Sequence, residues 1–164
     1  MNDLELDNKD RKNILEEFQV LLPLACEWAE VQERHILENG VALTKAQIED
    51  AKRVGVSHPE KVRLLKVYQI PLPEHPDLRA AVKTTQLISP KSIGLTLRYG
   101  IFIRSDLWGD RPLIVHELVH TFQYEQLGGF LPFLQKYLQE YLTIGYSDAP
   151  MEQEADRIAD EICI

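Results

Sequence analysis

The stretch PLIVHELVH (112–120) constrains this chain most, because it places three titratable side chains inside an apolar run. The run has the composition of a core helix, yet it contains His116, Glu117 and His120. Burying an ionised side chain is costly unless the group is paired or binds a metal. Any fold that buries this segment must therefore supply partners for all three groups.

The spacing of these three residues predicts a metal site. On a helix, His116 and His120 lie on one face, so both imidazoles can bind the same cation. Glu117 lies one step around the helix, where its carboxylate can reach a water on that cation without being a ligand. The alternative is a buried helix whose histidines form hydrogen bonds with their neighbours. We prefer the metal site, because the alternative needs a separate partner for each group.

A catalytic zinc site needs a third protein ligand and leaves one position for water. In MEQEADRIAD (151–160), Glu152 and Asp156 are one helical turn apart, on a face with small apolar residues that we expect to be buried. We therefore predict that Glu152 is the third metal ligand and that Asp156 orients a metal-binding histidine. A plain surface charge is the alternative interpretation of Asp156.

Glu154 is the alternative to Glu152 as the third ligand. It lies on the side of the helix that carries Arg157 and Glu161, where a solvent-exposed charge pair is the simpler interpretation. The other histidines, at positions 35, 58 and 75, show no metal-binding spacing and are predicted to lie on the surface.

Periodicity and turn residues predict an α+β fold, with helices packed on a small sheet. Thr44 and Gln47 resemble a capping box, and Pro23 is expected to kink or split the first helix. Ser147 or Asp148 is expected to cap the last helix, with Pro150 in its first turn. The expected elements are helices at about 14–39, 44–55, 76–84, 110–127, 131–143 and 148–162, a strand at 62–70, and a strand pair or one bent strand at 92–105. We expect a mobile tail (1–10), an N-terminal helical segment (11–56) and a metal-binding domain (57–164) that forms one compact unit with that segment.

Charge and cysteine content restrict the classes of partner. The net charge is −8, and a basic middle part (51–111) lies between acidic ends. Its Lys and Arg residues are dispersed, which favours intramolecular complementarity over nucleic-acid binding. Two cysteines, no secretory N-terminus and no run of about 18–20 apolar residues predict a cytoplasmic protein without a membrane segment. The oligomeric state stays open.

With HELVH and EQEAD together, the sequence resembles gluzincin-type zinc metallopeptidases, in which a glutamate is the third ligand. In that group an aspartate commonly follows this glutamate after four residues, and Glu152 with Asp156 match the pattern. The stretch IGLTLRYGIFIRSDLWGDRPLIVHELVHTFQYEQLGG (93–129) resembles compact bacterial metallopeptidases, and the similarity covers about residues 60–164. The resemblance implies a minimal zincin-like domain, a Zn²⁺ cofactor and an edge strand beside the active-site helix.

The resemblance also implies that strand GIFIR (100–104) borders the cleft and could pair with an extended peptide. It implies a Tyr or His that stabilises the transition state, for which we select Tyr146, with Tyr124 as the alternative. The expected function is a zinc-dependent hydrolase, a peptidase acting on a peptide or protein with a metal-activated water and Glu117 as general base. The alternatives are a non-catalytic zinc-binding module that acts through protein contacts and a metal-free helical scaffold.

Overall fold

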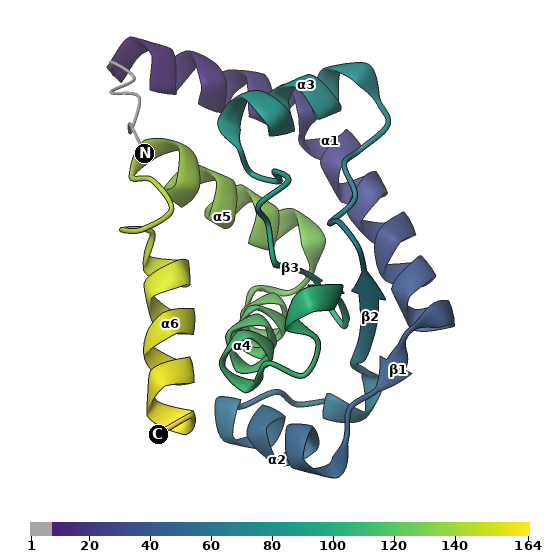
Figure 1. Ribbon diagram of the computed structural model, residues 1–164. Coiled ribbons are helices and arrows are strands. Elements are labelled where there is room, and N and C mark those ends of the chain that lie inside the picture. The colour runs from purple at the N-terminus through teal and green to yellow at the C-terminus, as the bar shows by residue number, and fades with distance from the viewer. Residues whose placement is uncertain (1–7) are drawn as a thin grey trace.

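The computed structural model describes residues 8–164 and combines helices with a small mixed sheet (Figure 1). This confirms the coarse α+β class predicted from the sequence. Residues 1–7 of the expected tail lie outside the described part, and residues 8–10 form the first turn of α1. The elements are α1 (Asn8–Asn39), β1 (Val41–Ala42), α2 (Lys45–Val54), β2 (Arg63–Val67), α3 (Pro76–Thr85), β3 (Gly94–Leu97), β4 (Gly100–Arg104), α4 (Arg111–Leu127), α5 (Phe130–Thr143) and α6 (Pro150–Ile162).

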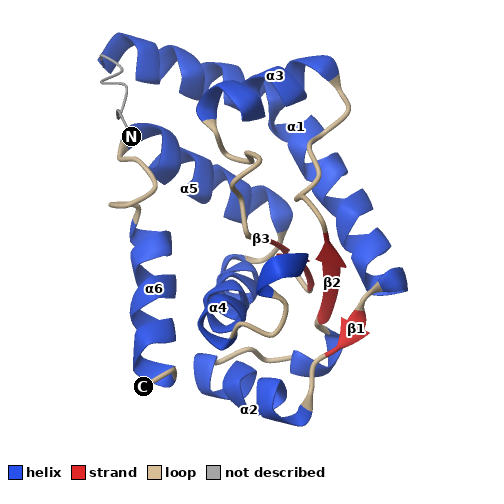
Figure 2. Cartoon of the chain, in the orientation of Figure 1, coloured by secondary structure: helices blue, strands red, loops and turns tan. Residues whose placement is uncertain are grey.

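Helix α1 is continuous, although it contains Pro23. Proline lacks the backbone N–H that an interior helix position donates, so it bends a helix more often than it leaves it straight. Figure 2 shows that α1 changes direction along its length and does not split into two helices. None of the helices within residues 8–164 is long and apolar enough to cross a membrane.

The ends of α2 follow the sequence signals closely. The Thr44 hydroxyl accepts a hydrogen bond from the N–H of Gln47, and the Gln47 side chain accepts one from the N–H of Thr44. This reciprocal pair satisfies two N–H groups that a helix start leaves without partners. Gly55 ends the helix with a φ of 109°, a left-handed conformation that glycine adopts without a steric penalty. The predicted capping box is therefore confirmed.

The sheet has the strand order β1-β2-β4-β3, and this order corrects one prediction. Strand β4, which is the GIFIR segment, pairs with β2 in parallel and with β3 antiparallel, so it is an interior strand. It cannot pair with a substrate, because both of its edges are already occupied. Strand β3 (Gly94–Leu97) takes the edge position instead. The physical reason is that β4 is apolar and buried over Gly100–Ile103, which suits a strand covered on both faces.

Helices cover the two faces of the sheet, as Figure 1 shows with α1 and α4 on opposite sides of β2. Phe102 of β4 belongs to the apolar cluster that includes Ile36 of α1. Its neighbours Ile101 and Ile103 point the other way and join the cluster that includes Leu118 of α4. This alternation places α4 directly against one face of the sheet.

The hairpin between β3 and β4 is fixed to α1. The buried carboxylate of Glu33 accepts hydrogen bonds from Nε and Nη2 of Arg98 at 2.8 and 2.6 Å, and one from the N–H of Tyr99 at 3.0 Å. Arg98 has a φ of 62°, which a non-glycine residue adopts only when its surroundings hold it there. The ion pair therefore orients the hairpin and, with it, the edge strand β3.

Candidate metal centre

Helix α4 presents the two histidines of the HELVH motif. Asp110 caps its start by accepting a hydrogen bond from the N–H of Leu113 at 2.9 Å, and Gly128 ends it with a left-handed φ of 98°. Between these ends the helix is buried on several sides, so His116 and His120 are carried into the interior on the face turned toward α6. Their ring centroids are 5.0 Å apart.

Helix α6 brings in Glu152 from its first turn. The small residues Ala155 and Ala159 are buried on the same helix, which lets α6 pack closely against α4. Pro150 lies in the first turn as predicted, but the residue before the helix is Ala149, which makes no side-chain cap. The prediction of a cap by Ser147 or Asp148 was therefore wrong. The chain still turns at these residues, so the helix starts one or two positions later than the polar residues suggested.

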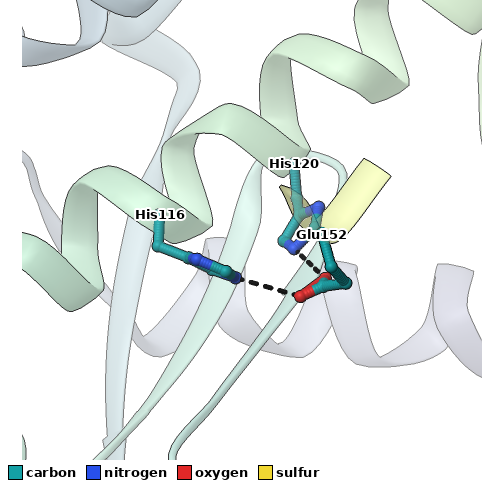
Figure 3. Close-up of side chains that lie close together, drawn as sticks. All are labelled: His116, His120 and Glu152. Carbon is teal, nitrogen blue, oxygen red and sulfur yellow. Dashed lines mark ion pairs between the residues drawn. The ribbon is translucent and has the colours of Figure 1, made fainter. Parts of the chain in front are cut away.

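The structure brings His116, His120 and Glu152 together (Figure 3). One carboxylate oxygen of Glu152 lies 2.6 Å from Nε2 of His120, and the other lies 3.2 Å from Nε2 of His116. The potential ligand atoms all lie within 4.8 Å of one another. Glu152 is only 2% exposed, so its carboxylate depends on these histidines for compensation of its charge.

Two observations test whether this cluster suits a metal ion. Oε2 of Glu152 is buried and, within the described residues, receives no hydrogen bond of good geometry, although His116 Nε2 is 3.2 Å away. A buried carboxylate oxygen without such a partner is costly, and coordination of a cation would satisfy it. Two imidazole nitrogens and one carboxylate are also a donor set that zinc uses in catalytic sites. The residues therefore fit a zinc ion.

The electrostatics of the metal-free cluster point the same way. Burial lowers the pKa of His116, but the close contact with Glu152 and the charges of Glu117, Glu152 and Asp156 outweigh it and raise the pKa to about 9. The pKa of His120 is also raised, since Glu152 overcomes the effect of burial. For Glu152, burial acts to raise the pKa, yet the two histidines lower it well below its usual range. In the metal-free protein, protons on the imidazoles supply the positive charge beside Glu152 that a bound cation would otherwise supply.

Asp156 contacts the first histidine, as predicted. Its Oδ1 lies 2.9 Å from Nδ1 of His116, on the opposite side of the ring from Glu152. A partner at this position fixes the orientation of the ring and increases the basicity of the other nitrogen. The side chain of Asp156 is 67% exposed, so the expectation that its helix face would bury it was wrong.

Gln123 makes the corresponding contact with the second histidine, and the sequence analysis missed it. Its Oε1 lies 2.8 Å from Nδ1 of His120, and its Nε2 donates to the carbonyl of Met151 at 3.0 Å. Gln123 also donates to Glu154 at 3.1 Å, so Glu154 contacts α4 and lies outside the three-residue cluster. The signal that could have found Gln123 is its position three residues after His120, on the same helix face.

Glu117 is held by the edge strand. It is 5% exposed, and the Thr96 hydroxyl of β3 donates to its Oε2 at 2.6 Å. Its other oxygen, Oε1, lies beside Gly94. A Cβ on residue 94 would be only 2.8 Å from Oε1, so glycine provides the space that the carboxylate occupies. Neither Thr96 nor Gly94 was predicted, because both belong to a strand whose position depends on long-range packing.

The two candidate tyrosines differ in their positions. Tyr146 is half exposed, and partial burial together with the charge of the nearby Glu152 carboxylate raises the pKa of its phenol. Tyr124 is 1% exposed, stacks on Phe133 and points its hydroxyl at the carbonyl of Thr96, 3.4 Å away. Of the two, only Tyr146 is placed to interact with Glu152, and Tyr124 is part of the core.

The remaining histidines take no part in the cluster. His35, His58 and His75 are exposed, as the sequence predicted. His58 pairs with Glu60 at 3.1 Å, and Nδ1 of His35 accepts a hydrogen bond from the side-chain NH₂ of Asn39 at 3.2 Å. Neither neighbourhood gathers three possible ligands, and the cluster on α4 and α6 is the one that does so in residues 8–164.

No family model, curated protein or solved structure matches this chain.

Proposed function

We propose that this chain is a zinc-dependent hydrolase, a peptidase with a zincin-like fold, in which His116, His120 and Glu152 bind Zn²⁺. The observation that supports the proposal best is the buried carboxylate of Glu152, which lies between the Nε2 atoms of both histidines with one oxygen lacking a good hydrogen bond. A buried carboxylate at this position needs positive charge beside it, which protonated imidazoles supply in the metal-free protein and a zinc ion would supply in a His₂Glu site.

A bound zinc ion would supply Lewis acidity and lower the pKa of a water molecule to about 7. The role of Glu117 is that of a general base and, later, a general acid. Thr96 occupies its Oε2, which leaves Oε1 to accept a proton from the attacking water and to deliver it to the leaving amine. Burial and the hydrogen bond from Thr96 keep this carboxylate in one orientation.

Tyr146 is our proposed hydrogen-bond donor to the oxyanion of the transition state. A tyrosine phenol is protonated at neutral pH, so the hydroxyl can donate. Its half-exposed position in the turn between α5 and α6 leaves it accessible to a substrate.

We propose that an extended peptide pairs with β3, the edge strand beside α4. An edge strand carries unpaired backbone groups, and a peptide strand can satisfy them by β-augmentation. The peptide would then run alongside the strand whose Thr96 holds the proposed base, Glu117. The peptide substrate and the cytoplasmic location stay predictions.

The test uses Glu117→Gln on the full chain. We expect the variant to keep its fold and its zinc, measured by circular dichroism and elemental analysis, and to lose at least about 10²-fold in cleavage of a mixed peptide library. Tyr146→Phe is assayed in parallel and is expected to retain zinc with reduced turnover. Equal cleavage by wild type and Glu117→Gln would refute the role of Glu117. A zinc-loaded wild type that cleaves no peptide and excludes a small hydroxamate would favour the non-catalytic module.

A further inference from the structure

Gln123 is a buried amide that contacts three groups on two helices. It is 5% exposed, and its side chain meets the ring of His120, the carbonyl of Met151 and the carboxylate of Glu154. Burying an amide is favourable only when its donors and acceptor are satisfied. One contact is with a ligand of the metal cluster, His120, and the other two are with residues one and two positions from Glu152.

The partners fix which way round the amide lies. The Met151 carbonyl and the Glu154 carboxylate can only accept hydrogen bonds, so the NH₂ group must face them. The carbonyl oxygen of Gln123 therefore faces Nδ1 of His120, which must carry a proton. With the proton on Nδ1, the lone pair of Nε2 is available to a metal.

The same amide also holds the backbone next to Glu152. The peptide group joining Met151 and Glu152 contributes its carbonyl to Gln123, while the N–H of Met151 donates to Oε1 of Glu140 at 2.8 Å. Helix α6 has no side-chain cap of its own, so these contacts from α5 and α4 fix its first turn. Glu152 projects from that turn.

We propose that Gln123 is a positioning residue for two of the three metal ligands, since it sets the tautomer of His120 and anchors the peptide unit that precedes Glu152. The inference rests on the proposed zinc site. It assigns to Gln123 the role toward His120 that Asp156 has toward His116. A neutral amide differs from the carboxylate in that it adds no charge to a cluster already surrounded by acidic groups.

The experiment compares wild type with Gln123→Met, which keeps the shape of the side chain and removes its hydrogen bonds. Gln126→Met, on an exposed position of the same helix, is the matched control. Zinc affinity is measured by competition with a chromophoric chelator, and metal-free stability by urea denaturation. We expect zinc to bind about 10–100-fold more weakly to Gln123→Met, with the control unchanged. A purely structural role would lower stability but leave the zinc dissociation constant of the folded protein as it is, and that result would overturn the proposal.

A second measurement needs no variant. In zinc-loaded wild type, nitrogen-15 NMR of the imidazoles should show His120 with a proton on Nδ1 and the metal on Nε2. The opposite tautomer would overturn the proposal even if Gln123→Met did not fold. A wild type that binds no zinc would refute the proposed function, whereas equal zinc affinity of wild type and Gln123→Met would refute only the role of Gln123.

Discussion

The metal-free and zinc-loaded proteins should respond to pH in opposite directions, because the same imidazoles bind either protons or zinc. In the metal-free fold, the pKa of His116 is raised from 6.5 to about 9. A group whose pKa is higher in the folded state contributes stability that is complete below its unfolded pKa and is lost as the pH rises through its folded pKa. The metal-free protein should therefore lose stability between pH 6 and pH 9.

The size of this loss follows from the shift. A change from 6.5 to about 9 corresponds to roughly 3 kcal/mol, at 1.36 kcal/mol per pKa unit. The lowered pKa of Glu152 reports the same ion pair, so the interaction is counted once. With an m-value of about 2 kcal/mol/M in urea, the midpoint of unfolding should fall by about 1.5 M.

The assay is urea denaturation at several pH values, with a chelator or with excess zinc. His116→Gln in chelator is the control, and its stability should depend less on pH than that of wild type. With zinc, stability should rise over the same pH range, because binding requires neutral imidazoles. Metal-free stability that stays level or increases from pH 6 to pH 9 would refute the assigned electrostatics.

Two further variants test the groups around the ligands. Gly94→Ala would place a Cβ 2.8 Å from Oε1 of Glu117 and so displace the proposed base. We expect peptide cleavage to fall by up to about 10²-fold while the zinc content stays the same. Unchanged turnover would contradict the proposed position of Oε1. Asp156→Asn should weaken zinc binding by about 10-fold, measured by chelator competition. This is the low end of the range for a partner of a ligand histidine, because the side chain of Asp156 is 67% exposed. An unchanged zinc affinity would show that Asp156 does not orient His116.

Local signals predicted the helices that carry the site. Asp110 and Gly128 mark the two ends of α4, and each acts within a few residues of its own position. The spacing of His116 and His120 fixes their common face for the same reason. Glu152 could be chosen over Glu154 because alanines on one side of the last helix indicate the face that packs closely.

The order of the strands could not be predicted in the same way. GIFIR was expected to border the cleft, but pairing with β2 places it inside the sheet. Sheet order depends on contacts between residues far apart in the chain, and the sequence gives no direct measure of them. The continuous apolar character of GIFIR was an available signal for an interior strand, because an edge strand with one exposed face usually alternates apolar and polar residues.

Thr96 and Gln123 show a second limit. Each is a single polar residue whose role depends on partners brought near by the fold, Glu117 for Thr96 and the residues Met151 and Glu154 for Gln123. Neither forms a pattern by itself. Composition and periodicity locate a buried face, but not which polar side chain will be satisfied there.

The most direct measurement is an anomalous difference map collected at the zinc absorption edge from crystals of the full chain grown with zinc. We expect one strong peak about 2.0–2.2 Å from Nε2 of His116, Nε2 of His120 and a carboxylate oxygen of Glu152. Crystals that show zinc elsewhere, or the three side chains in place with no peak between them at saturating zinc, would contradict it.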